Sequence, residues 1–231
     1  MIEIIPKVVN SAFIYFHSGS SSGDEITPFL GDLQLGLPRT YIWAGDGPID
    51  AAHEPIIGGA VTYGAGPERY WFVFPMHGSW EEDFAKAIEP VGAVLVTSGG
   101  YANAFVDQVI KRFQIKASRV VLCGHQHGAC VALSAAMMRR ADPYALTVLF
   151  DPWPMEAYYL QHEQNLPTTK VVCIDNLWVQ AREKGRGTTI ELSKVFKQYG
   201  IHAEGVTLPQ GGDEPDLHMF REAVRQIRAV L

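Results

Sequence analysis

The chain has 231 residues, of which 47% are hydrophobic and 19% charged, so it can build a sizeable core and does not have the composition of a disordered protein. Its formal net charge of −6 argues against nucleic acid or an anionic membrane surface as a partner. Cys123, Cys130 and Cys173 lie in apolar segments without metal-type spacing. They predict buried reduced thiols and no metal site.

The start of the chain does not have the pattern of a targeting segment. Residues 1–6 lack a basic start, a long apolar run and a small-residue cleavage site. No apolar stretch reaches the roughly 18 residues that a membrane-spanning helix needs. We therefore expect a cytoplasmic protein without a membrane span. We also expect a single domain over residues 1–231 and no cofactor.

Short apolar runs alternate along the chain with segments of helical periodicity, apart from the glycine-rich residues 49–69, which we expect to be an excursion over the sheet edge. This alternation predicts an α/β fold, with a mostly parallel sheet covered by helices on both faces. In chain order, the predicted elements are strand 12–16, helix 24–34 capped by Asp24, strands 40–44 and 69–74, helices 79–89 and 101–112, strand 119–123, helix 127–140, strands 146–150 and 170–174, helix 188–199, strand 202–208 and helix 217–230.

Ligands of such sheets bind at the carboxyl ends of the parallel strands. The polar residues at or beyond the predicted strand ends are therefore the candidates for chemistry. They are residues 17–20, Gln126, Asp151, Asp175 and His218.

Residues 124–128 read Gly-His-Gln-His-Gly, with an apolar strand before them and an alanine-rich helix after them. This is the layout of a nucleophile elbow, in which a serine is held on a sharp turn between a strand and a helix. Here Gln126 stands where the serine is expected. A carboxamide has no ionisable O–H or S–H and cannot act as the nucleophile.

Together with the segments around it, this motif resembles the α/β-hydrolase family, above all its small phospholipase/carboxylesterase branch, with some features of platelet-activating-factor acetylhydrolase. The resemblance spans nearly the whole chain and implies an α/β-hydrolase fold. Residues 16–20 are similar to the family's oxyanion loop, which implies that the backbone N–H groups of Gly19 and His127 form an oxyanion site. Trp153 is expected to line a pocket for a small-molecule ligand, apolar or acyl-containing.

The resemblance also implies the positions of a catalytic triad. Residues 151–154 read Asp-Pro-Trp-Pro and are similar to the acetylhydrolase segment that carries the acid, and His218 falls where the family has its histidine. The expected triad is Gln126, Asp151 and His218, in the family's chain order. Asp175 is the alternative acid, although it lies too early for the family's second acid motif. His218 is expected within hydrogen-bond reach of the acid and near Gln126.

His125 and His127 flank Gln126 at a spacing that is poor for zinc without a third ligand, and we expect both to serve packing. Three functions remain open. The first is a hydrolase-family protein whose ester hydrolysis is absent or impaired. The second is a non-catalytic small-molecule binder. The third is a lyase, cyclase or isomerase that uses Asp151 and His218 as an acid–base dyad.

Overall fold

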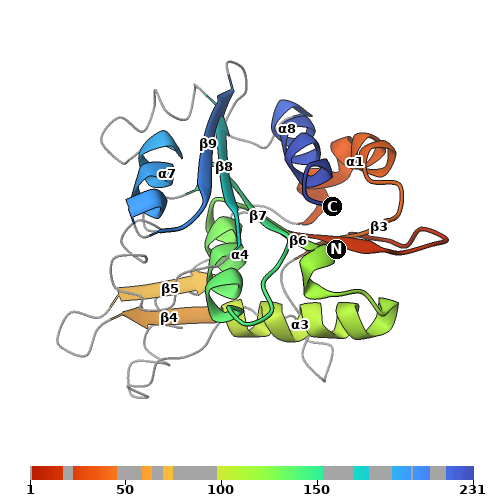
Figure 1. Cartoon of the computed structure of the whole chain (residues 1–231), viewed down its shortest axis with the longest axis horizontal. Helices are drawn as coiled ribbons and strands as arrows, with labels where there is room; N and C mark the ends of the chain where they lie inside the picture. The colour runs from red at the N-terminus through yellow and green to blue at the C-terminus, as the bar shows by residue number, and fades with distance from the viewer. Residues whose placement is uncertain are drawn as a thin grey trace.

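Within the described residues, the main sheet consists of seven strands in the order β1-β3-β2-β6-β7-β8-β9. Figure 1 shows it with the helices around it. All neighbours pair in parallel except β1, which is antiparallel to β3. The strands are β1 (Ile2–Ile4), β2 (Ser11–Phe16), β3 (Thr40–Gly45), β6 (Val120–His125), β7 (Leu146–Phe150), β8 (Val171–Asn176) and β9 (Ala203–Leu208). The computed structural model describes residues 2–17, 23–45, 59–63, 70–74, 98–152, 169–176, 189–198, 200–208 and 217–231.

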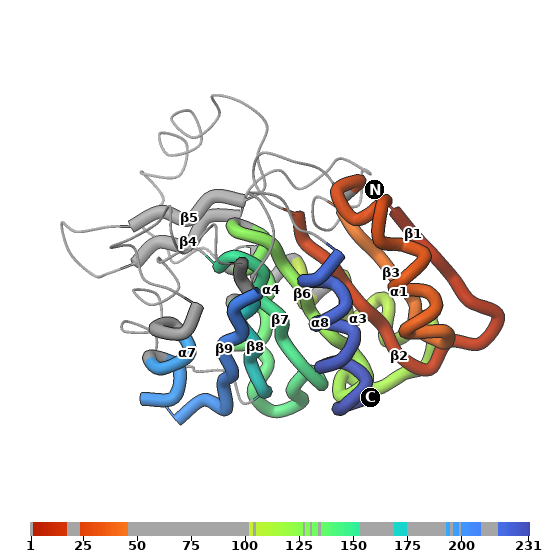
Figure 2. Tube along the Cα trace, turned by 90° about the horizontal axis from the view of Figure 1, so that it is seen from above, coloured from red at the N-terminus to blue at the C-terminus, as the bar shows by residue number. Residues whose placement is uncertain are grey.

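Helices cover both faces of the sheet (Figure 2), which confirms the predicted layers. Successive side chains of a strand point to opposite faces, and the core is divided accordingly into two clusters. Ile14 and Leu122 belong to the first cluster, and Phe13 and Val121 to the second. The first lies under α3 (Ser98–Phe113), α4 (His127–Met138) and α7 (Thr189–Gln198), and the second under the 3-10 helix η1 (Gly23–Phe29), α1 (Leu30–Gly36) and α8 (Leu217–Arg228).

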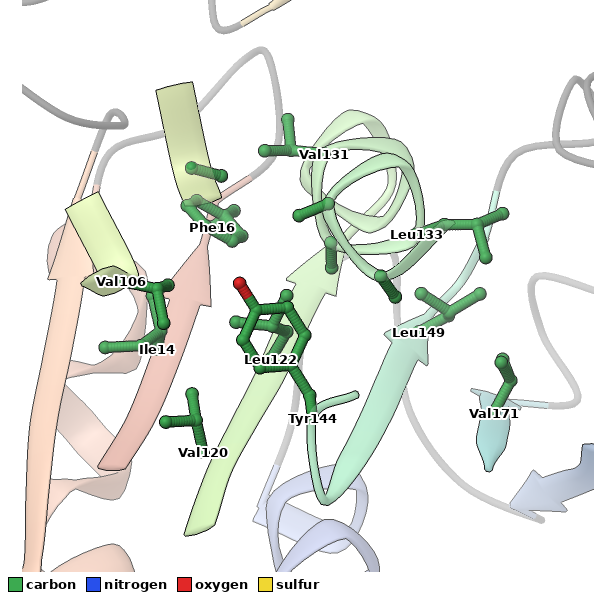
Figure 3. Close-up of a cluster of buried hydrophobic side chains, with 14 of the residues drawn as sticks. Ile14, Phe16, Val106, Val120, Leu122, Val131, Leu133, Tyr144, Leu149 and Val171 are labelled. Atoms are coloured by element: carbon green, nitrogen blue, oxygen red, sulfur yellow. The ribbon is translucent and has the colours of Figure 1, made fainter. Parts of the chain in front are cut away.

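The first cluster shows why the strands read as continuous apolar runs. Leu122 and Leu149 of the sheet lie below Val131 and Leu133 of α4 (Figure 3), and all four side chains are buried. A strand that is covered on both faces has no solvent side on which to place polar residues. Each large apolar side chain buried in this way stabilises the fold by about 1.5–3 kcal/mol.

The structure corrects the predicted helix at residues 24–34. It consists of η1 followed by the short helix α1, with the junction at Phe29 and Leu30. Pro28 lies inside η1. A proline has no N–H to donate and its ring clashes with the preceding turn, so a continuous α-helix is disfavoured there.

The prediction for residues 49–74 was only partly right. The strand expected at 69–74 is present as β5 (Tyr70–Phe74), but it pairs antiparallel with β4 (Gly59–Tyr63) in a separate two-stranded sheet. β4 lies within residues 49–69, which were expected to be an excursion over the sheet edge, and no strand was predicted there. The three-residue strand β1 was also not predicted, and the helix expected at 79–89 lies outside the described residues.

In the described ranges, no helix combines the length and apolar character needed to cross a bilayer.

Candidate active site

The order of the strands reverses between β2 and β6, because the chain proceeds from β2 to β3 on one side and from β6 to β7 on the other. In parallel sheets, the crevice outside the carboxyl ends of two such strands is the preferred ligand position. His17 directly follows β2, and Gln126 directly follows β6. The predicted elbow therefore lies at the one place that the topology favours for a ligand.

Gln126 adopts a strained backbone at the junction of β6 and α4. Its φ is 48° and its ψ −109°, and its side chain is partly exposed. Positive φ is uncommon outside glycine and costs roughly 1–3 kcal/mol, which the surrounding structure has to supply. The Gln126 N–H donates to the carbonyl of Phe150 at 2.9 Å, which ties the turn to the end of β7.

Two glycines make this turn possible. A Cβ on Gly124 would lie 2.0 Å from the carbonyl oxygen of Gly128, and a Cβ on Gly128 would lie 2.1 Å from that of Phe16. In both cases the atoms that the Cβ would meet belong to the backbone, which cannot move aside as a flexible side chain could. The Gly-x-x-x-Gly spacing thus allows α4 to start directly against the end of β2, beside His17, where the predicted oxyanion loop begins.

The start of α4 provides backbone donors at the crevice. His127 is the first residue of α4, so its N–H belongs to the first turn, where N–H groups have no acceptor within the helix. The partial positive charge of a helix N-terminus favours an anion at this place. This is the arrangement expected for one half of an oxyanion site. The other predicted half, Gly19, and the predicted pocket residue Trp153 lie outside the described residues.

Asp151 is the second strained residue of the site. It follows β7 directly, has a φ of 41°, and is only 6% exposed. Its N–H donates to the carbonyl of Ile174 in β8 at 2.9 Å. Its carboxylate lies against His125, with 3.6 Å between Oδ2 and the Nε2 of the imidazole.

His125 links this carboxylate to a second one. Its Nδ1 lies 3.6 Å from Oε1 of Glu25 in η1, and the Tyr15 hydroxyl donates to the same oxygen. We call these four residues, Tyr15, Glu25, His125 and Asp151, the buried charge cluster. The side chains of Glu25, His125 and Asp151 are between 1% and 6% exposed, so the cluster lies inside the protein, beneath the elbow.

Burial and charge act in opposite directions on His125. Burial lowers the pKa of the imidazole, but the carboxylates of Asp151 and Glu25 outweigh this effect together and raise the pKa to about 9. The imidazole is therefore protonated at neutral pH. Burial and the neighbouring Glu25 carboxylate also raise the pKa of the Tyr15 phenol well above its usual value, so Tyr15 remains a neutral donor.

The sequence did not predict this cluster. His125 was expected to serve packing, and Glu25 was not singled out. The alternation of side chains along β6 was the available signal. His125 points to the same face of the sheet as Val121 and Cys123, which belong to the second core cluster. A buried imidazole needs polar partners for its ring nitrogens, but the sequence does not show which residues supply them.

The other predicted site residues have different surroundings. His218 lies in the first turn of α8 with an exposed side chain, beside the buried Met219 and Phe220. Asp175 lies within β8, in register with Thr207 of β9. The pairing of His218 with Asp151 or Asp175 stays a prediction. Among the described residues, no group of His, Cys, Asp or Glu side chains is arranged to hold a metal ion.

Comparison with solved structures identifies the fold. Esterase PE8 superposes with a TM-score of 0.66 at 14% identity, with 100% of this chain and 98% of that chain covered. A Bacillus cereus carboxylesterase gives 0.58 at 11% identity, with 100% and 93% covered. SOBER1 of Arabidopsis thaliana gives 0.56 at 15% identity, with 96% and 99% covered. No family model and no curated protein sequence matches the chain.

Similarity over almost the full length of these esterases, together with the mostly parallel seven-stranded sheet, shows that the chain has an α/β-hydrolase fold. The fold class expected from the sequence is confirmed. At these identities the comparison establishes the fold alone, and the chemistry has to be argued from the site.

Proposed function

We propose that the protein is a carboxylesterase-like member of this fold in which ester hydrolysis is absent or strongly impaired, because Gln126 occupies the position of the nucleophile. The observation that carries this proposal is the backbone of Gln126. A residue at φ 48° between a strand and a helix, held between two glycines that backbone contacts require, has the geometry of a nucleophile elbow. The side chain presented there is an amide.

In a serine hydrolase, a hydroxyl attacks the acyl carbon, a histidine takes the hydroxyl proton, and backbone N–H groups hold the oxyanion. An amide has no such proton to lose, so no acyl-enzyme forms on Gln126. Oxyanion binding and substrate placement alone still accelerate a reaction by about 10³–10⁴ over water. A slow background hydrolysis is therefore compatible with the proposal.

The remaining roles follow the triad expected from the sequence. Asp151 is the acid and His218 the histidine that it orients. The N–H groups of His127 and Gly19 bind the oxyanion. Trp153 lines a pocket for a small, apolar or acyl-containing molecule.

A non-catalytic binding protein is the second candidate, and the partial exposure of Gln126 supports it. A carboxamide both donates and accepts hydrogen bonds. At the tip of the elbow it would hold the carbonyl or hydroxyl of a ligand without reacting with it.

The proposal is tested by placing a serine hydroxyl at position 126. In Gln126→Ser, we expect labelling by a fluorophosphonate probe and turnover of p-nitrophenyl esters roughly 100-fold or more above the wild type, since the nucleophile accounts for most of a serine hydrolase's rate. Gln126→Ala is the matched control, because it removes the amide without supplying a hydroxyl. Rapid labelling of the wild type would refute the proposal.

His218→Ala in the Gln126→Ser background tests the assigned histidine and should abolish the regained activity. Unchanged activity would remove His218 from the site. Ester binding without turnover in the wild type, lost in Gln126→Ala, is the result expected of the binding protein.

A further inference from the structure

His125 lies too deep to meet a ligand. Its side chain is 1% exposed, and its two ring nitrogens face the carboxylates of Asp151 and Glu25 from opposite sides. Any effect of His125 on chemistry at the crevice has to pass through another residue. Asp151 is that residue, because it follows the strand beside β6 and holds the carboxylate nearest to Nε2.

The register of the sheet produces this contact. His125 is paired with Phe150, the last residue of β7, and Asp151 is the next residue along the chain. The N–H groups of Gln126 and Asp151 donate to the carbonyls of Phe150 and Ile174, each at 2.9 Å. The ends of β6, β7 and β8 are thereby joined in sequence, and Asp151 is held at a positive φ over the imidazole.

The geometry of the cluster favours an imidazolium between the two carboxylates. Two ionised carboxylates on either side of a neutral imidazole would gain no charge compensation from it, although burying a carboxylate is costly. An imidazolium between them offsets part of the cost of burying the two negative charges. The titratable groups near His125 include Tyr15 of β2, Glu25 of η1, Cys123 of β6 and Asp151. Burial raises the pKa values of the Tyr15 phenol and the Cys123 thiol, so both groups are neutral.

We propose that His125 is a positioning residue for the acid of the site: its imidazolium, held from behind by Glu25, keeps the Asp151 carboxylate ionised and fixed at the end of β7, beneath the elbow. This inference deepens the proposed function and rests on it for the role of Asp151 as the acid. Glu25 acts on Asp151 through His125. It favours the protonated form of the imidazole, so that the proton stays on His125 and Asp151 remains a carboxylate.

The arrangement explains how an aspartate at the end of a buried strand stays charged although it is only 6% exposed. Burial alone favours the neutral carboxylic acid, which would neither orient a histidine nor stabilise its cationic form. The counter-ion for Asp151 comes from the residue directly before Gln126. The acid is therefore held by His125, the last residue of β6, and the turn is held by Gln126, the residue that follows it.

The first test needs no variant. Imidazole nitrogen shifts of the ¹⁵N-labelled full chain are followed from pH 5 to 10, with His125 assigned through sequential backbone correlations. We expect both ring nitrogens to remain protonated until a pH near 9. In Glu25→Gln, which keeps the size of the side chain, the transition should fall by about one pH unit or more. Titration of the wild-type imidazole near pH 6.5 would overturn the inference.

The second test follows activity in the Gln126→Ser background. The alkaline limb of the kcat/KM profile should coincide with deprotonation of His125, and Glu25→Gln should move this limb by about one unit to lower pH, with less than about a threefold change at pH 6. A purely structural role for Glu25 would change the height of the profile and not the position of the limb. The matched control is Glu204→Gln, which removes a carboxylate from β9, outside the buried charge cluster. It should leave the alkaline limb of the profile in place.

The two tests separate the two proposals. If Gln126→Ser stays inactive while His125 remains protonated to high pH and responds to Glu25→Gln, the proposed function fails and the charge arrangement stands. If Gln126→Ser gains activity but Glu25→Gln leaves its alkaline limb unmoved, the positioning role of His125 is refuted and the proposed function stands.

Discussion

Buried polar groups differ between the two ends of the parallel strands, which we call the amino edge and the carboxyl edge of the main sheet. At the amino edge, the Ser11 and Thr40 hydroxyls lie 2.8 Å apart at the starts of β2 and β3, and the Thr169 hydroxyl donates to the carbonyl of Tyr144 at 2.7 Å. These groups are neutral. At the carboxyl edge, the ionisable side chains of His125 and Asp151 lie 3.6 Å apart, and the backbones of Gln126 and Asp151 have positive φ.

The difference separates stability from chemistry. Neutral hydroxyl pairs satisfy buried donors at small cost and leave the backbone in ordinary strand geometry. Charged groups and strained turns raise the energy of the folded state, and they persist where the surrounding structure over-determines them. Of the three described non-glycine residues with positive φ, Gln114 lies between α3 and the start of β6, and Gln126 and Asp151 lie at the carboxyl edge. The two at the carboxyl edge are next to the buried His125, at the edge where parallel sheets bind ligands, which supports a site there. Three substitutions test the contrast.

The largest effect is expected from removing the cation of the buried charge cluster. His125→Leu leaves the carboxylates of Glu25 and Asp151 buried without their counter-ion, so we expect a loss of about 3–5 kcal/mol in the free energy of unfolding at pH 7. Urea denaturation followed by circular dichroism measures it. A loss below about 1 kcal/mol would mean that the two carboxylates are not ionised in the folded protein.

A comparable or somewhat smaller effect is expected at the elbow. Gly128→Ala places a Cβ 2.1 Å from the Phe16 carbonyl oxygen, and the backbone shift that follows should cost about 3 kcal/mol. Gly31→Ala in α1 is the matched control, because a Cβ there has no atom within 4 Å. It should stabilise the protein by up to about 1 kcal/mol. Equal effects at the two glycines would contradict the close approach of α4 and β2.

The smallest effect is expected at the amino edge. Thr40→Val removes one hydroxyl of the pair with Ser11 and should cost about 1 kcal/mol. The double variant with Ser11→Ala removes both partners and should be less destabilised than the sum of the two single variants. A loss as large as that in His125→Leu would show that buried polar groups at the two edges contribute equally to stability.

The sequence predicted the layers because buried parallel strands are apolar throughout, and runs such as residues 146–150 have few alternatives. It predicted the elbow because Gly124 and Gly128 combine a spacing with a strand before and a helix after. It did not predict β1, which has only three residues, β4, which lies in a glycine-rich segment, or the break in helix 24–34 that accompanies Pro28. These features depend on pairing partners and local sterics, which hydrophobic periodicity does not report.

The sequence was also insufficient for the partners within the site. The face of His125 follows from strand parity, but Glu25 lies a hundred residues earlier, and only the fold brings the two together. Asp151 was singled out by its place after a strand, and its contact with His125 depends on the register between β6 and β7. Pairwise geometry of this kind is set by tertiary structure and is not contained in the pattern of any one segment.

The pairing of β2 with β6 also sets an order of events when the chain is made. Ala12 of β2 pairs with Val120 of β6, so one edge of β2 has no partner in the sheet until more than a hundred further residues have been synthesised. At typical rates of translation this interval lasts roughly 5–20 seconds. During it, an apolar strand with an unsatisfied edge is exposed to other chains and to chaperones. The same crossover that creates the crevice at the elbow therefore leaves one edge of β2 unpaired until β6 has been made.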